Sequence, residues 1–123
     1  MKKLLIVDDS PVIRARISEL ALHPDLPALE IVGTARHGGE AVHMARLYQP
    51  EVVTMDLTMP NMDGINCIRE LMRISPSMRV LVISSLTDIK TPLQALNVGA
   101  LGFLQKPFSN DSLVDALQEL IAD

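Results

Sequence analysis

Reactive polar side chains stand just after short apolar segments at four places in this sequence. Asp8 and Asp9 follow residues 4–7, Asp56 follows residues 52–55, Ser84 follows residues 80–83, and Lys106 stands two places after residues 101–104. Carboxylate oxygens bind hard cations, and hydroxyl and ammonium groups can hold phosphate oxygens, when such groups lie together. Whether these side chains act as one site depends on the elements that carry them.

Three carboxylates in one place need a compensating charge. At about 4 Å, each like-charge pair costs roughly 4 kcal/mol at an effective dielectric near 20. Lys106 supplies one positive charge, and a divalent cation supplies more. Mg²⁺ suits one or two carboxylates together with water and a phosphate oxygen, with Mn²⁺ as the alternative ion. Because no histidine or thiol stands at ligand spacing, zinc is disfavoured.

Each of these residues also has a simpler interpretation. Asp8 and Asp9 precede Ser10 and Pro11 and could do no more than cap a helix. Asp56 could be an ordinary loop carboxylate, and Lys106 an ordinary solvated lysine. Ser84 could simply terminate a strand. Their joint occurrence at strand ends favours a shared site, and Pro107 adds an X-Pro bond of the kind that can be cis in tight turns.

The apolar segments alternate with segments of helical periodicity. Strands are predicted at residues 4–7, 29–34, 52–55, 80–83 and 101–104, and helices at residues 11–22, 39–48, 64–74 and 110–121. Ser10, Asp63 and either Ser109 or Asn110 are candidate N-caps. A fifth helix, beginning near Thr91 and Pro92, is expected to be short or to start irregularly.

This order, strand then helix five times over, predicts an α/β fold: a doubly wound parallel sheet of five strands with helices on both faces. Glu30 interrupts the second apolar segment, which suits an edge strand. If the sheet has the order 2-1-3-4-5, a common one for this architecture, strand order reverses between the first and third strands, where ligands bind. Asp8, Asp9 and Asp56 would meet at that point. Residues 1–123 are expected to form one domain.

Composition narrows the classes of function. The 123 residues carry 11 basic and 15 acidic side chains, a net charge of −4, which argues against a nucleic-acid-binding domain. The single cysteine, Cys67, cannot form an internal disulfide. The first apolar run is too short for a signal peptide, and no segment is long enough for membrane insertion. A reducing, cytoplasmic compartment is therefore expected.

Four segments closely resemble the receiver domain of two-component response regulators: LLIVDDS, VVTMDLTMPNMDG, VLVISS and GALGFLQKPF. The resemblance covers essentially the whole chain and implies a flavodoxin-like (βα)5 fold. The stretches HPDLPALEIVGTA and VLVISSLT are especially similar to the receivers of chemotaxis methylesterases, and they also suit other receivers in which a slightly long first helix precedes such a strand.

The resemblance also implies roles for individual residues. Asp56 would accept a phosphoryl group, and Ser84 and Lys106 would hold its oxygens. Mg²⁺ would be bound by Asp9 and Asp56, by Asp8 through water, and by the backbone carbonyl of Thr58. Phe103 stands at the position of an aromatic switch and, lacking a hydroxyl, could act only through packing, while Pro107 would have a structural role.

The resemblance further implies partners: a sensor histidine kinase or histidine phosphotransfer protein as donor, and a downstream protein target. Arg14 and Arg16 lie on the first helix, where kinases dock in this family, although a solvated face is the default for them.

Three other classes of protein remain alternatives to a stand-alone receiver. The chain could be the receiver part of a longer regulator with a methylesterase or DNA-binding output. A Mg²⁺-dependent hydrolase with an aspartyl-phosphate intermediate is less favoured, because such enzymes use Asp-x-Asp and not adjacent aspartates. A flavin-binding module is the least favoured, because the first loop lacks a cradle rich in Ser and Thr. The main expectation is a phosphoacceptor switch and not a turnover enzyme.

Overall fold

The computed structural model describes residues 1–57, 64–85 and 90–122. The strands are β1 (Lys2–Val7), β2 (Leu29–Ala35), β3 (Val52–Met55), β4 (Arg79–Ser84) and β5 (Gly102–Gln105). The helices are α1 (Pro11–Leu20), α2 (Gly38–Tyr48), α3 (Gly64–Ile74), α4 (Lys90–Asn97) and α5 (Asn110–Ile121). The predicted alternation of strands and helices is confirmed.

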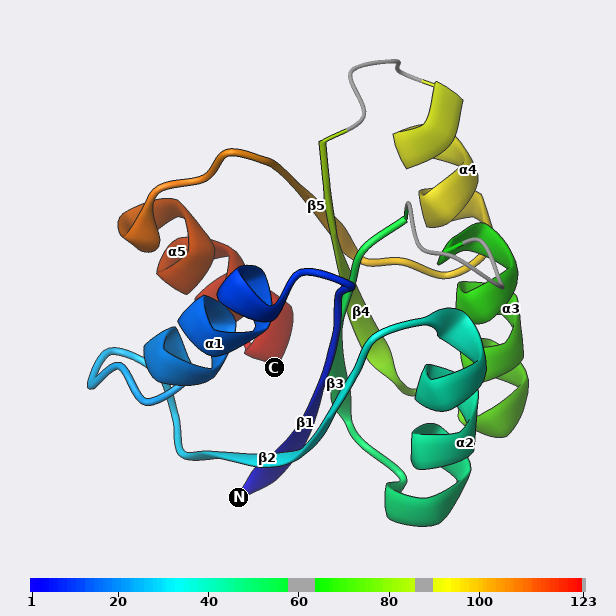
Figure 1. Ribbon diagram of the computed structural model, residues 1–123, viewed down its shortest axis with the longest axis horizontal. Helices are drawn as coiled ribbons and strands as arrows, with labels where there is room; N and C mark the ends of the chain where they lie inside the picture. Colours follow the sequence, from blue (N-terminus) through cyan, green and yellow to red (C-terminus); the bar gives the residue numbers. More distant parts are fainter. Residues whose placement is uncertain (58–63, 86–89, 123) are drawn as a thin grey trace.

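The four strand pairings within the described ranges are parallel, and the strand order is β2-β1-β3-β4-β5. Helices α1 and α5 cover one face of this sheet, while α2, α3 and α4 cover the other (Figure 1). The β2 strand forms one edge of the sheet, as the interruption at Glu30 suggested. The predicted fold class and strand order are therefore both correct.

The sheet separates two hydrophobic clusters, because successive residues of a strand point to opposite faces. On β1, Leu4 and Ile6 join the cluster beneath α1 and α5, whereas Leu5 and Val7 join the cluster beneath α2, α3 and α4. All four side chains are buried. Strands buried on both faces explain the nearly continuous apolar runs in the sequence.

The helix starts follow the capping residues that the sequence offers. The Ser10 hydroxyl accepts a hydrogen bond from the backbone N–H of Ile13, with Pro11 as the first helical residue, and the Ser109 hydroxyl accepts one from the backbone N–H of Ser112. The α4 helix has only 8 residues, in agreement with the expected short helix. The cap predicted at Asp63 lies outside the described residues.

Cys67 packs in α3, where its side chain is fully buried and its Sγ lies 3.8 Å from the carbonyl oxygen of Gly38. This agrees with an ordinary packing role.

None of the helices in the described ranges combines the length and the apolar content that crossing a bilayer requires.

Candidate functional site

Asp8 and Asp56 begin the loops that leave β1 and β3 at the carboxyl edge of the sheet. The backbone N–H of Asp8 donates to the carbonyl of Ala35 at 3.0 Å, and that of Asp56 donates to the carbonyl of Val7 at 2.9 Å. These bonds continue the parallel ladder past the last strand residues. The two aspartates therefore start from adjacent, rigid positions.

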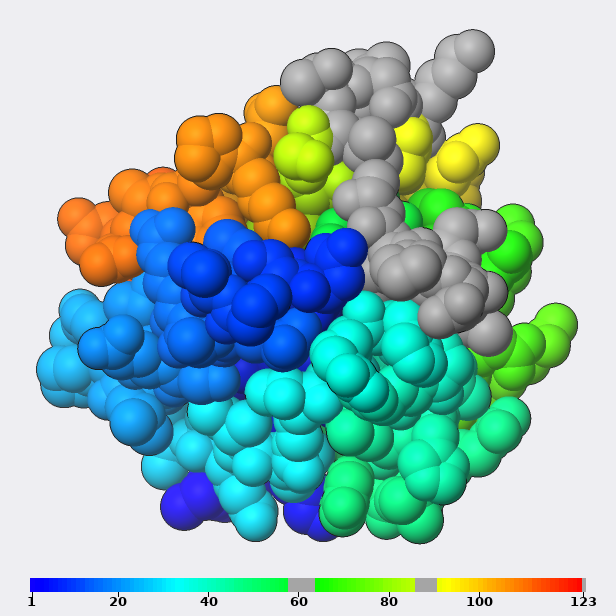
Figure 2. Space-filling model, in the orientation of Figure 1, coloured from blue at the N-terminus to red at the C-terminus, as the bar shows by residue number. Residues whose placement is uncertain are grey.

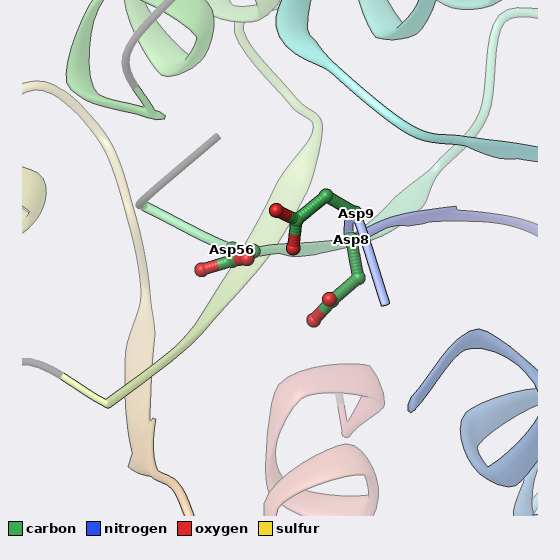
Figure 3. Close-up of side chains that lie close together, drawn as sticks. All are labelled: Asp8, Asp9 and Asp56. Atoms are coloured by element: carbon green, nitrogen blue, oxygen red, sulfur yellow. The ribbon is translucent and has the colours of Figure 1, made fainter. Parts of the chain in front are cut away.

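The carboxylates of Asp8, Asp9 and Asp56 converge at this edge (Figure 3). One oxygen from each lies within 4.8 Å of the others. Asp8 and Asp56 are only 1% and 2% exposed, whereas Asp9 is exposed to solvent. The predicted meeting of three acidic side chains is confirmed.

Lys106 lies between two of these carboxylates. Its Nζ is 2.9 Å from Asp8 Oδ2 and 3.6 Å from Asp56 Oδ2, and its side chain is 19% exposed. A partly desolvated ammonium interacts with buried carboxylates more strongly than a surface lysine would. The interpretation of Lys106 as an ordinary solvated lysine is therefore wrong.

Asp8 is bound from two further directions. The backbone N–H of Ser10 donates to its Oδ1 at 2.9 Å, and the guanidinium of Arg14 donates to its backbone carbonyl at 2.8 Å. Asp8 thus has both carboxylate oxygens engaged, one by Ser10 and one by Lys106. This arrangement fixes its side chain beside Asp56.

Ser84 ends β4 at the same edge and is fully buried. Its carbonyl accepts a hydrogen bond of 2.8 Å from the backbone N–H of Lys106, which ties the end of β5 to the end of β4. The Lys106–Pro107 peptide bond is cis, and Pro107 is exposed.

Phe103 is half-buried in β5 and packs against the cluster beneath α2, α3 and α4. It also lines a surface pocket with Leu101 and Gly102 of the β5 edge and with Ala116 and Leu120 of α5. Its switching role stays a prediction.

Thr58, the remaining predicted metal ligand, lies outside the described residues.

The donor set at this edge fits a hard divalent cation. Three carboxylates offer oxygen ligands, one of them from the solvent-accessible Asp9, and the described residues contribute no histidine or cysteine to the group. Mg²⁺ prefers such oxygen ligands and retains several waters, for which an exposed position leaves room.

Arg14 and Arg16 do not form the solvated face that was their default interpretation. Both are half-buried, and both donate to backbone carbonyls outside α1: Arg14 to that of Asp8 and Arg16 to that of Phe108. The reason is that each guanidinium reaches beyond its own helix to a carbonyl of a neighbouring loop. Helical periodicity does not report contacts of this kind.

Gly64 is a further residue that contributes to the site, and the sequence analysis gave it no role. A Cβ at this position would lie 2.5 Å from the Cα of Leu57 and 2.9 Å from the carbonyl oxygen of Asp56. The start of α3 therefore approaches the loop that carries Asp56 more closely than any residue with a side chain allows. The glycine at the end of VVTMDLTMPNMDG was the available signal.

Comparison with known proteins shows which family this sequence and this site resemble. Residues 4–118 match the family model of the response regulator receiver domain. A protein-glutamate methylesterase/protein-glutamine glutaminase from Photobacterium profundum is 43% identical over 98% of this chain, which spans only 32% of that protein. The chemotaxis protein CheY of Thermotoga maritima is 35% identical over 97% of both chains.

A solved CheX-CheY-BeF3-Mg complex from Borrelia burgdorferi superposes with a TM-score of 0.91 and 29% identity, covering 99% of this chain and 90% of that one. The chain spans about a third of the length of the methylesterases that it matches. Because the family match includes residues of all five strands and the whole acidic cluster, this chain belongs to the response regulator receiver domain family.

Proposed function

We propose that this receiver accepts a phosphoryl group on Asp56 and thereby switches a protein-binding surface. The observation that carries the proposal is the position of Asp56: a buried carboxylate with two further aspartates and the Lys106 ammonium around it. That combination supplies a nucleophile and, beside it, the charges that phosphoryl transfer requires.

The transfer is a displacement at phosphorus. A carboxylate oxygen of Asp56 forms the new O–P bond while the bond from phosphorus to the donor breaks. With a phosphohistidine donor that is a P–N bond, and the departing imidazole takes up a proton. Lys106 turns toward the incoming oxygens while it keeps its contact with Asp8, and it offsets their charge. The Ser84 hydroxyl donates to another of these oxygens.

We assign the metal site to Asp9 and Asp56 as direct ligands, to Asp8 through water, and to the carbonyl of Thr58. When bound there, Mg²⁺ would supply positive charge that offsets the charge on the transferred group. The donor chemistry of the acidic cluster supports Mg²⁺, with Mn²⁺ as the alternative. The CheY complex that resembles this chain contains Mg²⁺ together with BeF3.

We propose the following route for the signal. The phosphoryl group draws Ser84 toward it, which opens space that the half-buried ring of Phe103 fills. The surface formed by α4, β5 and α5 then shifts between two states. A phosphohistidine-bearing kinase or phosphotransfer protein is the donor, and a downstream protein reads the surface.

We propose that residues 1–123 act as one receiver unit in the cytoplasm and catalyse only their own phosphorylation and dephosphorylation. Several relatives are methylesterases, and this chain matches about a third of the length of each, so a methylesterase output is favoured over a DNA-binding one. An aspartyl-phosphate hydrolase has no comparable support.

The experiment is phosphorylation by acetyl phosphate with Mg²⁺, read by intact-mass spectrometry. We expect the parent chain to gain one phosphoryl group and Asp56→Asn to gain none, because the amide cannot serve as the nucleophile. Asp115→Asn, a change at an exposed position in α5, is the matched control and should be labelled like the parent. Equal labelling of Asp56→Asn and parent would refute the assignment.

A further inference from the structure

Arg16 connects α1 to the segment between β5 and α5. Its Nη2 donates to the carbonyl of Phe108 at 2.7 Å and to Asn110 Oδ1 at 2.8 Å, and its Nε donates to the same Oδ1 at 3.0 Å. Its guanidinium carbon also lies 4.4 Å from the centre of the Phe108 ring. Figure 2 shows the surfaces of these segments in contact, α1 in blue and the start of α5 in orange.

The segment that Arg16 holds is the one that carries Lys106. At the N-terminal end of this segment, the backbone N–H of Lys106 donates to the carbonyl of Ser84. At its C-terminal end, α5 starts after its cap, Ser109. Between these two ends, Phe108 is buried in the cluster beneath α1 and α5, while Pro107 is exposed and has no N–H to donate. Arg16 therefore supplies polar anchorage at the stretch where the chain leaves β5.

The other end of this connection reaches Asp8. Helix α1 follows its cap Ser10, whose N–H binds the Asp8 carboxylate, and Arg14, in the first turns of the same helix, binds the Asp8 carbonyl. Lys106 in turn contacts Asp8 at 2.9 Å. The contacts form a closed ring that runs from Asp8 through α1 and Arg16 to the Lys106 segment and back to Asp8.

We propose that Arg16 is a positioning residue for Lys106: it holds the carbonyl of Phe108 and the side chain of Asn110, just after Lys106 in the chain, so that the lysine amine stays within reach of Asp8 and Asp56. The proposal rests on the phosphoacceptor function given above. Arg16 touches none of the reacting groups. It acts through the segment that it holds, leaving the Lys106 side chain free to move toward the incoming phosphoryl oxygens.

An arginine suits this task better than a lysine would. Its planar group can donate in fixed directions to two acceptors and stack on an aromatic ring at the same time, and it stays charged at any physiological pH. A lysine at the same place could keep one hydrogen bond and part of the attraction to the ring, but not the fork. Arg16→Lys should therefore restore only part of the function that Arg16→Ala removes.

The test is the initial rate of Asp56 phosphorylation by acetyl phosphate in the presence of saturating Mg²⁺. We expect Arg16→Ala to lower the rate about tenfold or more, because misplacement of a catalytic group by about 1 Å can cost up to about a hundredfold. Arg16→Lys should recover part of that loss. Arg46→Ala, which removes an exposed arginine from α2, is the matched control and should keep the parent rate.

Two further measurements separate positioning from a general loss of structure. Mg²⁺ affinity, measured by titration calorimetry, should not fall in Arg16→Ala, because Arg16 contacts neither Asp9 nor Asp56 and a displaced Lys106 leaves less positive charge beside Asp56. In a Lys106→Ala background, adding Arg16→Ala should lower the rate no further, because the group that Arg16 positions is already gone.

If Arg16→Ala does not fold, Asn110→Ala replaces it, since this variant removes two of the three hydrogen bonds and keeps the contact with Phe108. Rates equal to the parent in either variant would overturn the proposal. So would an equal further loss in the Lys106→Ala background, or a proportional loss of Mg²⁺ affinity. An unlabelled parent would instead overturn the phosphoacceptor function itself.

Discussion

Lys106 contacts Asp8 at 2.9 Å and Asp56 at 3.6 Å, so a single ammonium is shared unequally between two buried carboxylates. The closer partner is the residue that we assign to the metal only through water. The longer of the two contacts is the one with Asp56, the nucleophile in our proposal. Lys106 can therefore turn toward a phosphoryl group on Asp56 without first losing its anchor on Asp8.

Thr54 illustrates the opposite case, a buried polar group without a described partner. Its side chain is 1% exposed in β3, and its hydroxyl oxygen forms no hydrogen bond within the described part of the chain. We predict that Thr54→Val raises the free energy of unfolding by about 1 kcal/mol, because an unsatisfied buried hydroxyl is replaced by a methyl group of similar shape.

Urea unfolding followed by circular dichroism measures this change. Thr34→Val, a half-exposed position on the edge strand β2, is the control and should shift the midpoint much less. A loss of stability in Thr54→Val would show instead that the hydroxyl has a partner that matters.

At the residue scale, the sequence predicted the groups that lie at strand ends and missed those that act across the fold. Asp8, Asp9, Asp56 and Lys106 could be placed because parallel strands end at a common edge. Arg16 could not, because its acceptor on Asn110 lies 94 residues away and follows a loop whose path no periodicity describes.

The start of α3 depends on the absence of a side chain at Gly64. Because a Cβ there would lie 2.5 Å from the Cα of Leu57, the backbone must move to accept one. We predict that Gly64→Ala lowers the free energy of unfolding by about 1–3 kcal/mol and slows phosphorylation of Asp56, whose carbonyl is also in the way. Urea unfolding and the acetyl phosphate assay measure the two effects.

Gly39→Ala is the matched control. A Cβ at Gly39, in the first turn of α2, would meet the ring of His37 no closer than 3.5 Å, an ordinary contact. Alanine is the better helix former, so this variant should be neutral or slightly more stable. The prediction for Gly64 fails if the two variants behave alike.

The start of α2 has a pH-dependent contact. The backbone N–H of Arg36 donates to Glu40 Oε1 at 3.0 Å, and this bond, helped by the Arg36 guanidinium, lowers the pKa of Glu40 below its ordinary value of 4.5. A carboxyl with a lowered folded-state pKa stabilises the fold above its ordinary pKa and loses that contribution as pH falls through the lowered value.

We therefore predict that Glu40→Gln is less stable than the parent at neutral pH, and that the difference shrinks as pH falls below 4.5. The effect should be small because the pair is near the surface. Urea midpoints across this range, with the exposed Glu30→Gln as control, measure it. A difference that does not change with pH would contradict the assigned cause.

Elements were easier to predict than their exact starts. Ser10 with Pro11 is a strong local signal, and α1 starts where these residues indicated. For α5 the sequence left Ser109 and Asn110 as alternative caps, and Ser109 is the cap. His37 carries no such signal, yet its Nδ1 accepts from the N–H of Glu40 and caps α2. A histidine can do this only with an unprotonated Nδ1, a state that sequence patterns do not reveal.

For the molecule as a whole, the acidic cluster links metal binding to stability. Asp8, Asp9 and Asp56 repel one another in the folded chain, and a cation that binds only the folded state shifts the equilibrium toward it. We predict that Mg²⁺ raises the thermal midpoint, with a gain of about 2.7 kcal/mol at a concentration about one hundred times the dissociation constant.

Differential scanning calorimetry at increasing Mg²⁺ measures this gain, with KCl at matched ionic strength as the control for screening. Asp9→Asn should weaken the dependence, because it removes a ligand that we assign to the metal. A midpoint that rises equally with KCl would mean that the cluster binds no ion of its own.

The sheet also has an evolutionary consequence. Leu4 and Leu5 are neighbours in the chain, yet each faces a different helical layer, and the same alternation continues along β3 and β4. A change of volume in one layer can therefore be compensated within that layer alone. We therefore expect homologous chains to accumulate core substitutions independently on the two faces of the sheet, as long as the sheet edge that carries Asp8 and Asp56 keeps its shape.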